Sequence, residues 1–369
     1  MLALALLVLA APPEPAPTAM KDALDALVTV TPWLSSPDAF RSPDNAAAIS
    51  RSLDTLARLR HPFFTARSAS PSAVAELFGR QAAFAQADFA SNNTERARYR
   101  VRSLSQVCLG CHLRSSKRSF VDLEGKVAQL QLPPLQQAEL FATTRQFDKA
   151  IALWRTELVK PVKAETDLLE QLDGLRLAVR VAVQSRDDAK LARELIGAQL
   201  RRPEVPAFVA RELASWDKDV IEWQRERFVV ASQPPAALMS RARALIEDAG
   251  AAKTVAPVTD RFVALLRAAS ALDEALRQAP DGPHRGEALW LLGVVHASLG
   301  DAPLWQLEWL YLEGCVRENP GTPRAVECAK RLRERVHYSW RTVADVPPDV
   351  FKRLGDLAAI ANEKAGATP

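Results

Sequence analysis

The chain has 369 residues, 48% of them hydrophobic and 25% charged, which predicts an ordinary soluble globular protein long enough for two domains. Its net charge is only +4, and its basic residues are not interleaved with aromatic ones, which argues against a nucleic-acid-binding protein. Glycine is scarce, and proline-containing breaks separate long segments of helical periodicity. No run of alternating apolar and polar residues is long enough to predict a strand, so we expect an all-α fold.

The first eleven residues form an apolar segment that resembles a signal peptide. A run of about ten apolar residues is too short to span a bilayer and has the length of a secretory hydrophobic region. Ala10 and Ala11 suit cleavage, and residues 12–19 would form a Pro-rich mature N-terminus. Because no Lys or Arg precedes the run, a membrane-retained anchor is the alternative. We expect an exported, periplasmic bacterial protein whose signal peptide (residues 1–11) is cleaved.

Three amphipathic helices are expected in the first hundred residues. The first runs from Met20 to about Thr31, with apolar residues at helical spacing, and stops near Pro32. The second begins after residues 42–44 and ends before His61. The third opens at residues 70–72.

A fourth helix begins at Asn93 or Thr94 and contains a cysteine pair. Its apolar stripe is spaced alternately four and three residues apart, which places all members on one helix face. The stripe consists of Ala97, Val101, Leu104, Cys108 and Cys111. We therefore expect both cysteines, and His112 beside them, to point into a four-helix bundle.

Cys108, Cys111 and His112 form a C-x-x-C-H sequence, the attachment signature of a c-type haem. In that chemistry the two thiols bind the vinyl groups of the porphyrin, and the imidazole is the proximal iron ligand. A zinc site would need a second pair of ligands at metal-binding spacing, and a thioredoxin-like pair would need a βαβ context; the sequence has neither. Since bacterial haem attachment takes place outside the cytoplasm, the expected signal peptide supports one covalent haem c.

A four-helix bundle with this motif late in its last helix, followed by the basic residue Arg114, resembles the cytochrome c′ family. It also resembles a group of bacterial proteins in which such a bundle precedes a helical-repeat region. The resemblance covers about residues 20–118, the expected haem bundle. The elements that carry it besides the haem motif are Met20-Lys21, Phe40, Pro43-Asp44-Asn45, Ile49–Leu56 and Ala97-Arg98.

The resemblance also bears on the distal side of the iron. In six-coordinate relatives a methionine near the start of the first helix is the distal ligand, which makes Met20 the candidate here. In five-coordinate relatives an apolar side chain blocks that position, and the iron binds small gases. Core packing is the alternative role for Met20, and His61 is the rival ligand. The resemblance further implies a homodimer formed through the first two helices.

Positive charge is concentrated in the expected bundle. Residues 12–118 carry fourteen Lys and Arg against nine Asp and Glu, whereas the remainder is close to neutral. The basic residues around the motif could pair with haem propionates or steer an acidic redox partner. A solvated helix surface is the alternative explanation for each of them.

Residues 119–135 are expected to be a linker, and residues 136–365 an array of helical hairpins. Ala138–Thr144, a turn at Arg145-Gln146 and Phe147–Trp154 resemble the hinge of a tetratricopeptide unit, although no fixed period of about 34 residues recurs. Stacked helix pairs leave a concave surface on which a partner protein could dock. Further helices are expected near residues 164–185, 188–200, 206–226, 236–249 and 256–279.

Cys315 and Cys328 flank a turn, Asn319-Pro320-Gly321-Thr322-Pro323, between two helical segments. They could face each other across a hairpin as a disulfide in an oxidising compartment; two buried thiols are the alternative.

We therefore expect an exported monohaem c-type cytochrome that transfers one electron to or from a redox partner, with the helical array as a docking scaffold. A five-coordinate protein that binds nitric oxide or carbon monoxide is one alternative. A protein-interaction scaffold with a structural haem is another. No catalytic motif is present, so we do not expect an enzyme.

Overall fold

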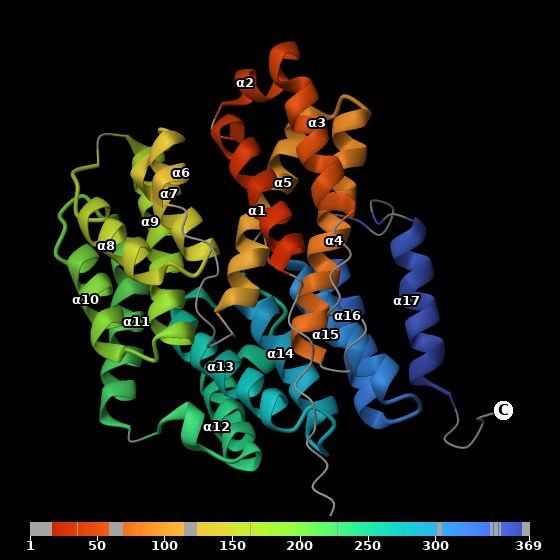
Figure 1. Ribbon diagram of the computed structural model, residues 1–369. Helices are drawn as coiled ribbons and strands as arrows, with labels where there is room; N and C mark the ends of the chain where they lie inside the picture. The colour runs from red at the N-terminus through yellow and green to blue at the C-terminus, as the bar shows by residue number, and fades with distance from the viewer. Residues whose placement is uncertain are drawn as a thin grey trace, which may run out of the picture.

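The computed structural model describes residues 17–34, 36–58, 69–113, 124–162, 164–226, 228–300, 305–339, 342, 346 and 348–363. Within these ranges the secondary structure consists of helices without any strand, which confirms the expected all-α class (Figure 1). The expected signal peptide, residues 12–16 and His61 lie outside the described residues. None of the described helices combines the length and the apolar character needed to cross a membrane.

Five helices form the N-terminal part of the molecule. They are α1 (Pro17–Leu34), α2 (Pro37–Arg41), α3 (Pro43–Arg58), α4 (Ala69–Ala90) and α5 (Thr94–His112). Apart from the short α2, they start where the sequence pattern predicts within a few residues. Ser36 caps α2 by accepting a hydrogen bond from the Ala39 amide, and Pro37 occupies the first turn, where a missing N–H costs nothing.

The end of α1 corrects one prediction. The helix continues past Pro32 to Leu34, although proline was expected to end it. Only the last turn is affected, so the missing amide removes a single helical hydrogen bond. The guanidinium of Arg98 on α5 donates to the Leu34 carbonyl oxygen at 2.7 Å, and a cation is favourable at a helix C-terminus. A contact from a distant helix therefore stabilises the final turn.

Helices α1, α3, α4 and α5 pack side by side, and their apolar faces form two adjoining clusters. In the first cluster the rings of Phe40 and Phe89 meet edge to face, with centroids 5.7 Å apart. Leu53, Val101 and Leu104 have no exposed surface, and burying a side chain of this size stabilises the fold by roughly 1.5–3 kcal/mol. Most of the buried side chains between these four helices are therefore apolar, and Ser52, Gln81 and Ser103 are buried polar residues.

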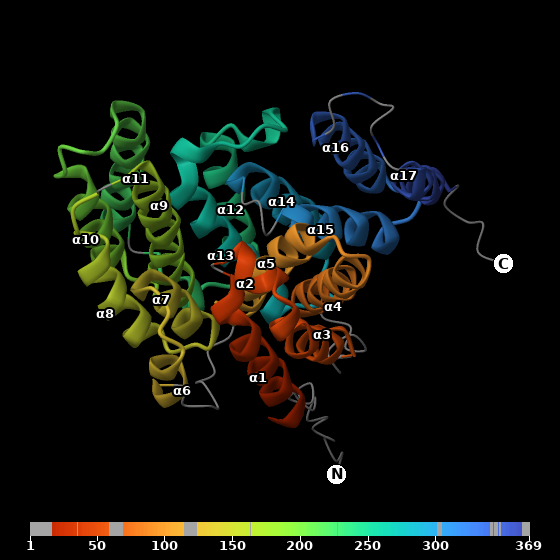
Figure 2. The ribbon, with the colours of Figure 1, turned by 90° about the horizontal axis from the view of Figure 1, so that it is seen from above.

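The remaining helices follow an arc, and α1–α5 lie on its inner side (Figure 2). Neighbours in the chain pair along the arc, as in α7 with α8, α10 with α11, α12 with α13 and α14 with α15. On the inner side, α5 contacts α7, while α4 contacts α13 and α15. The bounds are α6 (Glu124–Gln129), α7 (Pro134–Thr143), α8 (Phe147–Glu157), α9 (Glu165–Arg180), α10 (Ala189–Leu200), α11 (Ala207–Arg225), α12 (Pro235–Asp248), α13 (Phe262–Gln278), α14 (Arg285–Leu299), α15 (Trp305–Glu318), α16 (Pro323–Ser339) and α17 (Pro348–Ala361).

Two segments of the arc differ from the expected pattern. Helix α6 lies inside the expected linker, and Lys126 on α6 forms an ion pair with Asp25 on α1, with Nζ and Oδ1 2.6 Å apart. Helix α13 begins at Phe262 rather than near residue 256. The Val258 amide donates instead to the Ser298 carbonyl oxygen of α14 at 2.7 Å, and a short 3₁₀ turn, Thr259–Arg261, precedes the helix.

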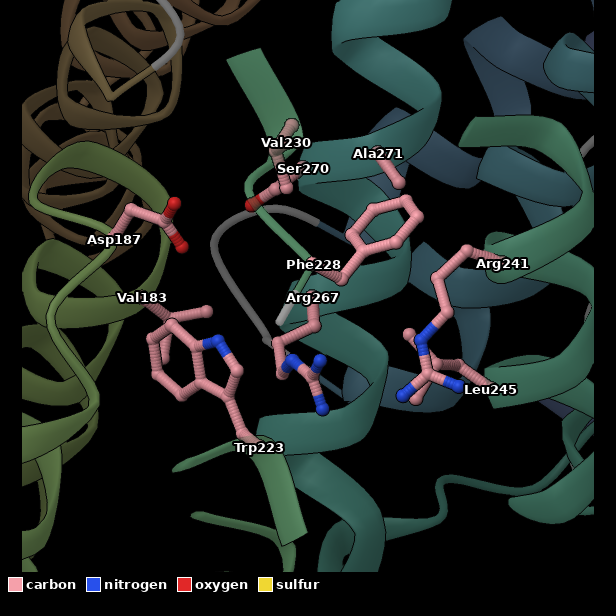
Figure 3. A pocket seen from close by; sticks show the side chains of 10 residues that line it. All are labelled: Val183, Asp187, Trp223, Phe228, Val230, Arg241, Leu245, Arg267, Ser270 and Ala271. Carbon is pink, nitrogen blue, oxygen red and sulfur yellow. The ribbon is translucent and has the colours of Figure 1, made fainter. Parts of the chain in front are cut away.

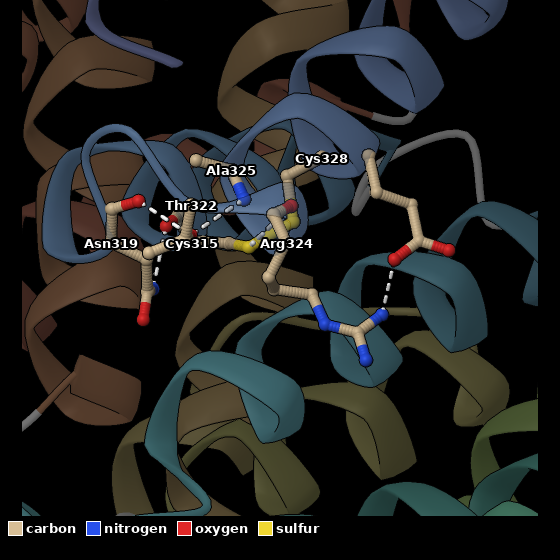
Figure 4. The surroundings of a disulfide bond; sticks show 7 residues. Cys315, Asn319, Thr322, Arg324, Ala325 and Cys328 are labelled. Carbon is tan, nitrogen blue, oxygen red and sulfur yellow. Dashed lines mark hydrogen bonds and ion pairs between the residues drawn. A yellow bond between two sulfur atoms is a disulfide. The ribbon is translucent and has the colours of Figure 1, made fainter. Parts of the chain in front are cut away.

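A disulfide between Cys315 and Cys328 joins α15 to α16 (Figure 4). The connection between them is a tight turn in which Gly321 has a positive φ of 71°. The Thr322 hydroxyl accepts a hydrogen bond from the Ala325 amide and so caps α16. Both cysteines are fully buried, so the bond closes a hairpin inside the core.

Candidate functional site

Helix α5 carries the C-x-x-C-H motif in its last two turns and begins at a sequence-encoded turn. Asn92 adopts a left-handed conformation with φ 62°, which asparagine tolerates better than most residues. The Asn93 amide then donates to the Asp88 carbonyl and the Asn92 amide to the Phe89 carbonyl, which closes the end of α4. This turn sets the direction of α5 and therefore the faces on which its residues lie.

The face of α5 that meets the other N-terminal helices is the one expected from the sequence. Ala97, Val101 and Leu104 are completely buried on it. Cys108 follows on the same stripe and is half-buried. It packs against a cluster that consists of Ala23, Ala26, Leu27, Leu56, Ala82 and Leu104, as does Phe78. The sulfur of Cys108 is therefore in apolar surroundings between α1, α3 and α4.

Two of the predicted site residues have side chains outside the described part of the structure. Cys111 belongs to α5, one turn after Cys108, and Met20 belongs to the first turn of α1. Ala23, three residues after Met20, lies in the same cluster as Cys108. The backbone position of Met20 is thus within one helical turn of a residue that packs at the motif.

The side chain of His112 contacts the end of α7. Its Nδ1 lies 2.5 Å from the carbonyl oxygen of Thr143, the last residue of α7. A carbonyl oxygen can only accept a hydrogen bond, so Nδ1 carries the proton. In the neutral imidazole the lone pair is then on Nε2, the arrangement that metal-binding histidines use when a carbonyl orients them.

The neighbouring α5–α7 contact is polar and closely packed. The Ser105 hydroxyl donates to the Glu139 carboxylate at 2.5 Å, and the Thr143 hydroxyl lies 3.3 Å from the Ser105 carbonyl oxygen. Burial raises the pKa of the Glu139 carboxyl, against the opposing effects of the Ser105 hydrogen bond and the Arg102 charge. Leu109 and Leu113, which precede and follow His112 in the chain, are buried. Sequence reasoning missed Ser105, Glu139 and Thr143.

The only sequence signal for this contact was the turn at Arg145-Gln146. The structure confirms that turn, because Arg145 has a φ of 65° and α8 begins at Phe147. It marks the end of α7 but does not say which helix lies opposite.

Arg96, Arg98 and Arg100 on α5 form ion pairs within the protein, whereas Arg114 lies outside the described residues. Arg100 donates to the Asp88 carboxylate at 2.7 Å and to the Gln81 side chain at 2.8 Å, and its guanidinium lies over the Phe84 ring. Arg98 binds Glu95 in addition to the Leu34 carbonyl. These side chains therefore stabilise the packing of α1, α4 and α5.

A small hollow, partly open to solvent, lies beside the end of α11 and between α12 and α13 (Figure 3). Trp223 and Phe228 supply its apolar lining. Arg267 and Arg241 both bind the single carboxylate of Glu226, and the Arg267 guanidinium lies 5.2 Å from the Trp223 ring centroid. These three charges are paired with one another. Asp187 also lines the hollow, and burial raises the pKa of its carboxyl against the opposing charge of Arg267.

Over the described ranges, no group of three or more His, Cys, Asp and Glu side chains is arranged to hold a metal ion. Comparisons with protein-family models, curated proteins and solved structures find no match.

Proposed function

We propose that the protein is an exported monohaem c-type cytochrome that transfers single electrons. The observation that carries the proposal is the hydrogen bond of the His112 imidazole, and the tautomer that it implies, within the C-x-x-C-H sequence. Its Nδ1–H is engaged by the Thr143 carbonyl oxygen, which leaves Nε2 with the lone pair that an iron ligand needs. This tautomer occurs in a histidine that directly follows two cysteines at haem-attachment spacing, which supports its role as the iron ligand.

The residues around the motif fit a covalent haem. Cys108 and Cys111 would form the thioether bonds, and His112 would be the proximal ligand. Met20 is the candidate distal ligand, because its helical turn adjoins the Cys108 cluster through Ala23. A bound haem c would supply the Fe(III)/Fe(II) couple.

The surrounding side chains would shape that chemistry. Phe78 and Leu56 at Cys108 present apolar surface, which limits access of water and lowers the local dielectric. Cys108 is only half-buried, so part of its surface is open to an attaching group.

We propose that α1, α3, α4 and α5 are a cytochrome c′-like four-helix bundle, and that α6–α17 are a tetratricopeptide-like array. The side-by-side packing of the first set and the pairing of neighbours in the second support this division. The inner side of the arc contacts α4 and α5 of the same chain, so a redox partner would dock on the outer surface or on the bundle (Figure 2).

The test is expression of the full chain in a bacterium competent in cytochrome c maturation. We expect a haem absorbance that stays with the polypeptide through denaturation and acid-acetone extraction. Cys108→Ser with Cys111→Ser should abolish it, whereas the matched control, Cys315→Ser with Cys328→Ser, should retain it. His112→Ala should change the visible spectrum of any haem that remains attached.

The same preparation tests the choice between electron transfer and gas binding. A low-spin spectrum that carbon monoxide does not alter in the reduced protein would support two protein ligands, and its loss in Met20→Ala would identify the second. A high-spin spectrum that shifts with carbon monoxide would favour a gas-binding protein. Absence of covalent haem from the wild-type protein would refute the cytochrome proposal altogether.

A further inference from the structure

The C-terminal end of α7 has an acceptor that its own helix cannot satisfy. The Gln146 amide donates to the Phe141 carbonyl at 2.8 Å, and the Arg145 amide to the Ala142 carbonyl at 3.0 Å. This is the pattern of a Schellman turn, which satisfies those two carbonyls but leaves the next one exposed along the helix axis. That next carbonyl belongs to Thr143, and the imidazole of His112 donates to it.

The position of this carbonyl also has an electrostatic consequence. The unsatisfied carbonyl groups at a helix C-terminus carry a partial negative charge equivalent to about half an electron. A hydrogen bond from Nδ1 to such a group increases the electron density of the ring. The other ring nitrogen then becomes a stronger donor to a metal, and outer hydrogen bonds of this kind tune metal sites.

Three side chains clamp the end of α7 against α5. The Thr143 hydroxyl lies 2.8 Å from the Glu139 carbonyl oxygen and 3.3 Å from the Ser105 carbonyl oxygen, so it can share its proton between the two helices. The Ser105 hydroxyl donates back to the Glu139 carboxylate. Thr143 is almost fully buried, which shields these bonds from competing water.

We propose that the end of α7 is the positioning element of the haem site. Thr143 and its clamp fix the orientation and tautomer of His112, and the helical array thereby sets the reduction potential of the iron. This inference rests on the proposed function. It makes the helical array a part of the redox centre in addition to its role as a scaffold.

A direct test of the geometry needs no haem. Full-length protein prepared without haem and labelled with ¹⁵N would be studied by NMR to determine the His112 tautomer. We expect the Nδ1–H tautomer, with a ring proton that exchanges slowly with water. The Nε2–H tautomer, or rapid exchange at Nδ1, would overturn the inference.

The second test measures the potential of the haem-loaded protein. Thr143→Val keeps the shape of the side chain but removes the hydroxyl that binds α5. A weaker hydrogen bond to His112 leaves the ring less electron-rich, so the reduction potential should rise and the equilibrium with a redox mediator should shift toward the reduced form. Thr143→Ser restores a hydroxyl and should restore the potential.

Thr144→Val is the matched control for this series. The Thr144 hydroxyl donates to carbonyls of α7 at 3.0 Å and accepts a hydrogen bond from the Gln146 side chain at 3.1 Å, so its loss perturbs the end of α7 through bonds that do not involve α5. If the reduction potential shifts equally in both valine variants, or does not shift in Thr143→Val, the positioning role of Thr143 is overturned. The cytochrome proposal would remain intact. Absence of covalent haem in the wild-type protein, seen before any potential is measured, would instead refute the proposed function.

Discussion

Glu308 is a buried acid whose ionisation should weaken the fold. Its side chain lies on α15 and is 2% exposed. One carboxylate oxygen accepts a hydrogen bond from Arg335 at 2.6 Å, while the other is buried with no hydrogen-bond partner among the described residues. Burial raises its pKa from 4.5 to about 7, against the opposing effect of the Arg335 charge. The proton is therefore bound more tightly in the folded protein than in the unfolded chain.

The sign and size of the effect follow from linkage. Because the folded pKa is raised, the stabilising contribution is complete below about pH 4.5 and is lost as the pH rises through about 7. Each unit of difference between the folded and the unfolded pKa corresponds to about 1.4 kcal/mol. The rise from 4.5 to about 7 therefore amounts to about 3 kcal/mol of unfolding free energy. The glutamine in Glu308→Gln cannot ionise, so the variant should not lose this stability as the pH rises.

The assay is urea unfolding of the wild type and of Glu308→Gln between about pH 4.5 and pH 8, within the range where both fold reversibly. We expect the stability of the wild type relative to the variant to fall by about 3 kcal/mol as the pH rises. Glu247→Gln, at an exposed position on α12, is the surface control. A difference between wild type and variant that stays constant across this range would refute the reasoning.

Three further changes test the packing. Cys315→Ala removes the disulfide that closes a 13-residue separation, so the melting temperature should fall by an amount equivalent to about 3 kcal/mol under oxidising conditions, and hardly at all in the presence of reductant. Gly293→Ala would place a Cβ 2.6 Å from the Leu312 side chain and should destabilise by about 1–3 kcal/mol, whereas Gly125→Ala meets nothing within 4 Å and should be neutral or stabilising in the same calorimetric comparison. Leu104→Ala should cost about 2–5 kcal/mol in chemical unfolding, and a cost below 1 kcal/mol would contradict its complete burial.

The local elements were predictable because their signals lie within a few residues of one another. Pro43 and Thr94 open helices, Arg145-Gln146 forms a turn, and helical periodicity places Cys108 on the stripe of Leu104. The end of α1 was not predictable from Pro32, because the Arg98 side chain that stabilises its last turn comes from 64 residues farther along the chain.

The sequence by itself determined the helical class, the phase of the α5 stripe and the presence of a C-x-x-C-H motif, since each depends on spacing along one segment. Tertiary structure decided that Arg100 pairs with Asp88 and that the inner side of the arc meets the chain's own helices. It also decided which group His112 contacts. That acceptor is a main-chain carbonyl, which every residue has, so no residue type could reveal it. Only the approach of α7 to α5 distinguishes the carbonyl of Thr143 from all the others.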